Sequence, residues 1–192
     1  MLKNLVDRNE KINDVTAFLL EHHTYFGSSV LMLEGFAEFL RSNFLSFRAS
    51  NLKIYILYPT VHYLEALSEG ENTEKATAAQ RAIGIVQGLV KYGIADLVGH
   101  AENRFHESQQ LLIETVKYRT KRSLAFVTCN RKLQNDLVMQ NGIRSFNGEV
   151  ISVLYLTRSG NMYRCFDETE QTKCISAETD EDDDLLKLFN IA

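Results

Sequence analysis

The chain has 192 residues, 45% of them hydrophobic, which is long enough for one sizeable core and unlike a disordered segment. Its 21 Lys and Arg against 25 Asp and Glu give a net charge of −4, which excludes a uniformly basic nucleic-acid wrapper but not a local basic groove. The three cysteines form no CxxC pair, which argues against a disulfide framework and a zinc knuckle. The sequence contains no apolar run of about 18 residues, the length that would indicate a membrane span. We expect a soluble, cytoplasmic protein with one main domain and no membrane contact.

The first part of the chain predicts a helix, a strand and a second helix. Residues 13–27 carry a cap, helically spaced apolar residues and a glycine stop, which indicate a helix. The continuous apolar run "SSVLML" at 28–33 predicts the first strand, and 36–47 returns to helical spacing. Residues 1–27 are therefore predicted to be an N-terminal helical extension that precedes the main domain.

The rest of the chain alternates between strand and helix patterns. Strands are predicted at 52–58, 94–98 and 124–128, and helices at 60–70, 71–93, 100–122 and 131–139. Two further strands, 149–157 and 161–166, flank "RSGN" as a hairpin. This alternation predicts an α/β domain over residues 28–166, a three-layer sandwich with a mainly parallel central sheet, the extra N-terminal helix and a C-terminal hairpin.

Residues 167–192 have a different composition from the predicted domain. Five consecutive acids, 180–184, precede a short apolar segment that contains Leu185, Leu186, Leu188 and Phe189. One interpretation is a solvated acidic linker whose last carboxylates cap a terminal helix; the other is a tail that binds a protein partner.

Acids or an amide stand beyond four of the predicted strands. They are Glu34, Glu65, Glu107 and Asn130. Ligands and catalytic residues of an open parallel sheet gather outside the carboxyl ends of its strands, so the topology could bring these side chains together. Clustered carboxylates need a cation to stay ionised, and a hard divalent metal is the natural counter-charge.

The order of these residues resembles the PIN-domain family of metal-dependent nucleases. The matching segments are "VLMLEGFAEFL", "YPTVHYLEAL", "NRFHESQQLLIETVKYR" and "FVTCNRKLQNDL", in the family's order over about residues 28–155. In that family an acid ends the first strand, "P..V..E" leads the next helix, another acid opens the fourth helix, and a strand closes with "T.D..L".

The resemblance implies a PIN-like fold and hydrolysis of RNA phosphodiesters with Mg²⁺ or Mn²⁺. Its implied catalytic residues are Glu34, Glu65, Glu107 and Asn130, of which the three glutamates would be the metal ligands. The implied nucleic-acid contacts are Thr128, Arg131, Lys132, Lys121 and Arg122. Small members of the family often act as toxins of toxin–antitoxin systems and commonly pair, so RNA and a second copy of the chain are the expected partners.

The chain departs from the family pattern at three positions. Glutamate stands at Glu34 and Glu107 where the family usually has aspartate, and Asn130 brings no charge. The alternative is therefore a catalytically degenerate PIN-like module that binds RNA or a protein partner; a third hypothesis is an unrelated α/β protein.

The same residues also have ordinary structural explanations. Glu34 suits the first turn of a helix, Glu65 a solvated face and Asn130 a helix cap, while Asp96 could take the place of Glu107. The basic residues of "KYRTKR" suit a helix C-terminus.

Overall fold

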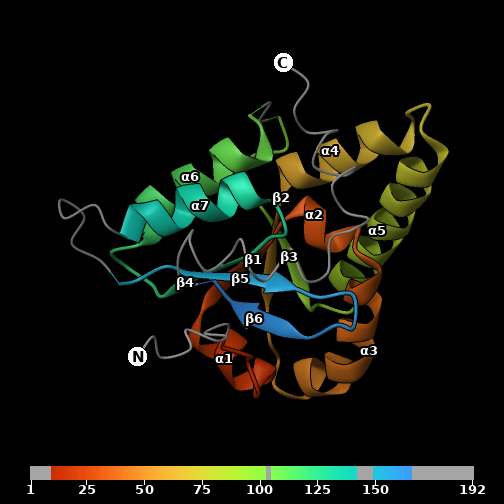
Figure 1. The fold of residues 1–192 in the computed structure, drawn as a ribbon. Coiled ribbons are helices and arrows are strands. Elements are labelled where there is room, and N and C mark those ends of the chain that lie inside the picture. Colours follow the sequence, from red (N-terminus) through yellow and green to blue (C-terminus); the bar gives the residue numbers. More distant parts are fainter. Residues whose placement is uncertain (1–9, 103–104, 142–148, 166–192) are drawn as a thin grey trace, which may run out of the picture.

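The computed structural model describes residues 10–102, 105–141 and 149–165, which form a sheet with helices on both faces (Figure 1). The six strands lie in the order β3-β2-β1-β4-β5-β6. Their bounds are β1 His23–Phe26, β2 Ile54–Leu57, β3 Ala95–Val98, β4 Leu124–Val127, β5 Ser152–Leu156 and β6 Met162–Arg164. The first five strands are parallel, and β6 returns antiparallel to β5.

Strand β1 lies in the interior of the sheet. It pairs with β2 through Tyr25 and Tyr55 and with β4 along its whole length, from His23 opposite Leu124 to Phe26 opposite Val127. Because it has a neighbour on each side and helices on each face, three of its four residues are buried. The other parallel strands lie on its two sides, β2 and β3 on one and β4 and β5 on the other.

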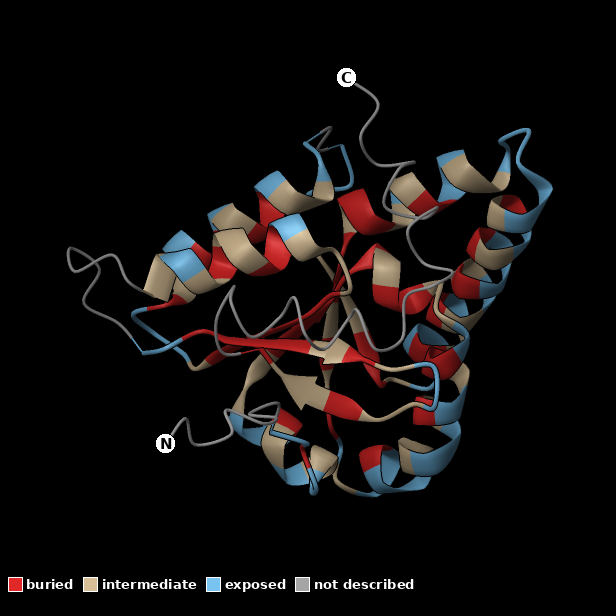
Figure 2. Ribbon diagram, in the orientation of Figure 1, coloured by how far each residue is buried: buried red, intermediate tan, exposed pale blue. Residues whose placement is uncertain are grey.

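The helices divide between the two faces. Their bounds are α1 Val15–Glu21, α2 Ser28–Leu31, α3 Glu34–Ala49, α4 Tyr58–Ser68, α5 Thr73–Lys91, α6 Glu107–Tyr118 and α7 Arg131–Asn141. One core cluster joins the first five helices to one face of the sheet, and a second joins α6 and α7 to the other, so buried residues line both faces of the strands (Figure 2). This layering is compatible with the predicted three-layer sandwich.

Local sequence signals set several helix boundaries. The Asp14 carboxylate accepts a hydrogen bond from Ala17 N at 2.9 Å at the start of α1, and Asn72 caps α5 through Lys75 N at 3.0 Å. Pro59 stands in the first turn of α4, where its missing N–H is not needed. The carboxyl end of β2 therefore runs directly into a helix.

Two predicted elements in the N-terminal part of the chain are wrong. The expected helix over 13–27 ends at Glu21, and His23–Phe26 is the interior strand β1. The expected strand over 28–33 is instead the single helical turn α2. A short apolar run has no periodicity that separates a strand from a buried helix, and β1 is buried on both faces and so shows no polar alternation. The first strand therefore lies within residues 1–27, the predicted N-terminal helical extension.

The remaining predicted strands and helices are present, with shifted ends. The hairpin is formed by β5 and β6, paired from Leu154 opposite Arg164 to Leu156 opposite Met162. The acidic segment 180–184 and the apolar residues after it lie outside the described residues. No helix in the described ranges is long and apolar enough to cross a membrane.

The β5–β6 hairpin packs closely on α3 through two glycines. A Cβ added at Gly35 would lie 2.7 Å from the Arg158 carbonyl oxygen and still closer to that of Thr157. Gly160 has φ +77°, and a Cβ there would lie 2.7 Å from Phe39 N. The hairpin therefore needs glycine at both positions.

We predict that Gly35→Ala lowers the free energy of unfolding by about 1–3 kcal/mol or more, because its methyl group meets backbone that cannot move independently. Gly84→Ala in α5 is the matched control: nothing lies within 4 Å of its added Cβ, so we expect a gain of up to about 1 kcal/mol. Urea unfolding measures both. Equal effects of the two substitutions would contradict the close packing of the hairpin.

Candidate functional site at the carboxyl edge of the sheet

A polar cluster lies at the carboxyl edge of the parallel strands. We call Ser28, Ser29, Thr60, Glu107 and Thr128 the carboxyl-edge cluster. Ser28 and Ser29 follow β1, Thr60 stands in the first turn after β2, Glu107 begins α6, and Thr128 follows β4. The parallel topology brings these residues together from four separate parts of the chain.

Glu107 is the only carboxylate of this cluster, and both of its oxygens accept hydrogen bonds. Oε1 accepts from Ser28 N at 2.6 Å and from Thr60 Oγ1 at 2.9 Å. Oε2 accepts from the Ser28 hydroxyl. Hydrogen bonds to an ionised acceptor are among the stronger ones in proteins, so these three donors fix the side chain.

Burial raises the pKa of Glu107 above its ordinary value of 4.5. The hydrogen bonds from Ser28 and Thr60 act in the opposite direction but are the smaller effect. The pKa of Tyr63, on α4, is also raised, first by its own burial and then by the negative charge of Glu107. The carboxylate therefore sits in a poorly solvated place, and no described cation pairs with it.

A chain of hydrogen bonds links the loop after β1 to the loop after β4. Ser29 Oγ lies 3.2 Å from Thr128 Oγ1 and accepts a bond from Cys129 N at 3.0 Å. Thr128 Oγ1 in turn accepts from Asn130 N at 3.1 Å. Asn130 Oδ1 accepts from Leu133 N at 3.1 Å, which is the geometry of a helix cap for α7. The amide oxygen of Asn130 is therefore already engaged by the backbone.

Neither of the other two predicted metal ligands shares a described hydrogen-bond partner with Glu107. Glu34 is exposed in the first turn of α3 and does not end a strand. Glu65 is exposed and lies 3.2 Å from Nδ1 of His62. Within residues 10–102, 105–141 and 149–165, no three His, Cys, Asp or Glu side chains form a group that could hold a metal ion.

The predicted nucleic-acid contacts divide between the two edges of the sheet. Thr128 is buried inside the cluster, while Arg131 and Lys132 begin α7 at the carboxyl edge, where Lys132 is exposed and Arg131 half-buried. Lys121 and Arg122 are exposed and lie just before β4, at its amino end. The full length of β4 therefore separates the two basic pairs.

Sequence reasoning missed Ser28 and Thr60, the two residues that bind Glu107. The available signal was a pair of short hydroxyl-bearing segments after strands, "GSS" and "YPT". The first is hidden because the apolar run 28–33 predicts a strand, and Ser28 then stands at the start of a strand and not after one. The second follows a correctly predicted strand, but a hydroxyl carries no charge pattern of its own.

A second carboxylate of α6, Glu114, lies further along the helix and is buried. It accepts hydrogen bonds from the Tyr25 hydroxyl at 3.0 Å and from Gln110 Nε2 at 3.0 Å. Burial and the charge of Glu114 raise the pKa of Tyr25. This group ties α6 to the interior strand, so α6 is anchored at two points by carboxylates.

We predict that Glu107→Gln changes the pH dependence of stability. The folded protein holds the Glu107 proton more tightly than the unfolded chain, so the wild type loses stability as the pH rises from about 4.5 through the raised pKa. The amide can keep Oε1 on Ser28 N and Thr60 and donate to the Ser28 hydroxyl, so the variant folds without this loss.

Urea unfolding of both proteins over this pH range measures the effect. The free energy of unfolding of the variant minus that of the wild type should increase with pH, since the other titrating groups cancel in the difference. A difference that stays constant would contradict a raised pKa at Glu107.

No protein-family model and no curated protein sequence matches this chain. The fold class and the side chains at the sheet edges are therefore the basis for any inference about its function.

Proposed function

We propose that this chain is a catalytically degenerate PIN-like module that binds RNA at the carboxyl edge of its sheet without cleaving it. The observation that carries the proposal is the state of Glu107, whose two oxygens accept three hydrogen bonds from Ser28 and Thr60. A carboxylate has about four lone-pair sites, and the protein itself uses three of those of Glu107, which leaves little of the side chain for a metal.

The donor set does not fit a hard divalent ion. The PIN resemblance implies an acid at the end of the first strand, and that strand is β1, which is followed by Gly27 and Ser28. Asn130, where the resemblance implies another acid, uses its oxygen to cap α7. One half-buried carboxylate, Glu107, then remains, and hydroxyl and backbone N–H groups donate hydrogen bonds to it.

RNA is the ligand class that the resemblance supplies, and α7 offers charges suited to it. Lys132 is exposed in the first turn of this helix. The Nε of its neighbour Arg131 is buried and has no hydrogen-bond partner among the described residues. Exposed cations beside a helix N-terminus can neutralise phosphates without any sequence readout.

We predict that one acid added beside Glu107 creates a metal site. A Cβ at Gly27 would lie 3.5 Å from Thr128 Oγ1 and 3.2 Å from Glu107 Oε1, a tight contact that any substitution there shares, and the backbone φ of −84° is not restricted to glycine. Gly27→Asp should therefore place two carboxylates side by side, whereas the isosteric control Gly27→Asn places only one.

In chelator, we expect Gly27→Asp to melt at a lower temperature than Gly27→Asn. Mn²⁺ should raise the melting temperature of Gly27→Asp and leave Gly27→Asn and the wild type unchanged, because only a carboxylate pair attracts the cation. A clear Mn²⁺ response of the wild type, lost in Glu107→Gln, would contradict the degenerate site.

We predict salt-dependent binding of single-stranded RNA without cleavage. Lys132→Ala should weaken binding at low salt and reduce the slope of log affinity against log salt by about 0.7, the value for one phosphate contact of a single strand. Lys91→Ala, an exposed lysine at the end of α5, is the matched control and should bind like the wild type.

Fluorescence anisotropy measures the affinity, and denaturing gels with Mg²⁺ or Mn²⁺ detect cleavage. Equal binding by the two lysine variants, or no binding at low salt, would overturn the RNA proposal. Metal-dependent cleavage that Glu107→Gln abolishes would instead support an active PIN-like ribonuclease.

A further inference from the structure

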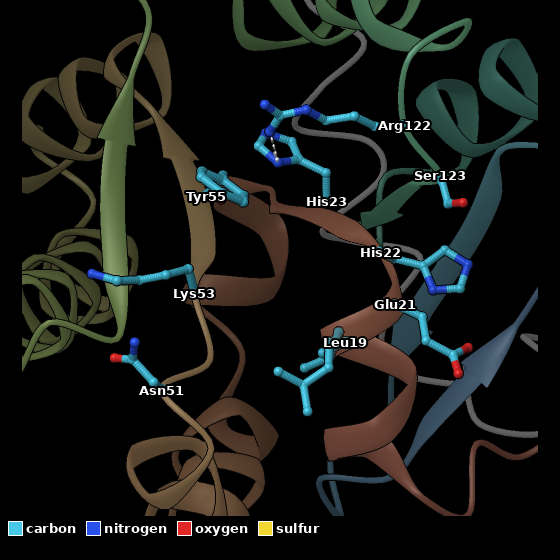
Figure 3. Close-up of a pocket in the computed structure, with 10 residues that line it drawn as sticks. Leu19, Glu21, His22, His23, Asn51, Lys53, Tyr55, Arg122 and Ser123 are labelled. Atoms are coloured by element: carbon cyan, nitrogen blue, oxygen red, sulfur yellow. Dashed lines mark hydrogen bonds between the residues drawn. The ribbon is translucent and has the colours of Figure 1, made fainter.

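A pocket lies at the amino edge of the sheet, opposite the carboxyl-edge cluster (Figure 3). Its volume is about 410 Å³. It is lined by Leu19, Leu20, Glu21, His22, His23, Asn51, Lys53, Tyr55, Arg122 and Ser123. The end of α1 and the segments that lead into β2 and β4 bring these residues together, and none of them belongs to the carboxyl-edge cluster.

Arg122 is the cation best placed to bind a ligand in this pocket. One of its N–H groups donates to Nδ1 of His23 at 3.2 Å, and its guanidinium lies over the ring of Tyr118 at 5.9 Å. It pairs with no carboxylate among the described residues. A guanidinium has five N–H donors, so most of them stay available for an anion.

The imidazole of His23 stacks on the ring of Tyr55, so each ring covers one face of the other and leaves its outer face and edge toward the surroundings. Their ring centroids are 3.5 Å apart, with an interplanar angle of 23°. Burial, and then the charge of Arg122, lower the pKa of His23 to about 4, so the ring is neutral at pH 7. Its Nδ1 accepts from Arg122, which leaves Nε2 as an N–H donor.

The rest of the lining divides into apolar and polar parts. Leu19 is buried and Leu20 is 54% exposed, so α1 contributes an aliphatic wall. Lys53 Nζ lies 3.1 Å from Asp96 Oδ1, so the charge of the lysine is partly neutralised. The Ser123 hydroxyl donates a hydrogen bond to the Glu149 carboxylate. Figure 3 shows Lys53 and Glu21 pointing to opposite sides of the pocket, so the Glu21 carboxylate does not neutralise the lysine.

We propose that this pocket binds a nucleoside monophosphate, with its phosphate on Arg122 and its base against the aromatic and aliphatic walls. The volume falls within the range of about 300–1,000 Å³ that is usual for small-molecule sites. Aromatic rings and arginine planes are the surfaces on which proteins hold single bases, and arginine matches the geometry of phosphate. The site is separate from the RNA surface proposed for α7 and does not depend on it.

Calorimetric titration with AMP and with adenosine tests the proposal on the full chain. We expect AMP to bind, and adenosine, which lacks the phosphate, to bind at least about tenfold more weakly. Arg122→Ala should weaken AMP binding by a similar factor. Arg48→Ala, an exposed arginine in the last turn of α3, is the matched control and should bind like the wild type.

A second pair of variants tests the aliphatic wall. Leu20→Glu adds a negative charge to the pocket at an exposed position and should abolish AMP binding, whereas Leu45→Glu, at a position that is 79% exposed on α3, should not. Absence of AMP binding, equal affinity for adenosine, or unchanged AMP binding in Arg122→Ala or Leu20→Glu would each overturn the proposal. Lys132→Ala should bind AMP normally, so failure of the RNA proposal can be told apart from failure of this one.

Discussion

The parallel pairing of β1 with both β2 and β4 is the constraint on which the rest of the structure depends. Thr24, Tyr25 and Phe26 are at most 1% exposed, because the strand has a neighbour on each side and helices on each face. Parallel strands buried in this way must be joined by crossovers, so each strand ends at a loop that leads to a helix. These loops, aligned by the pairing of the strands, form the two edges at which the polar side chains gather.

The two edges carry different chemistry although the same strands connect them. The carboxyl edge holds hydroxyl and amide groups around one carboxylate, and the amino edge holds aromatic rings with arginine and lysine. A four-residue strand at about 3.3 Å per residue separates the edges by about 13 Å. A small ligand therefore occupies one edge at a time, and the two proposed ligands do not compete for the same side chains.

Glu107 is held at the carboxyl edge by hydrogen-bond donors of the protein and not by a described cation. A carboxylate away from water needs either a cation or hydrogen-bond donors. Ser28 and Thr60 supply the donors, and the backbone N–H of Ser28 is available because α2 begins at this residue. The acid then locks α6 against the ends of β1 and β2, a structural task that Glu114 repeats on Tyr25.

The sequence by itself determined the α/β class, the hairpin and most helices and strands, because their periodicity and turn residues are local. It also identified Glu107 as a residue at a strand edge and offered the capping role for Asn130. Only the tertiary structure decided that His23–Phe26 is a strand and that 28–31 is a helix, since a short segment buried on all sides has no polar face to reveal its period. The same is true of the partners of Glu107: Ser28 and Thr60 are 79 and 47 residues away in the sequence, and only strand pairing brings their hydroxyls to its carboxylate.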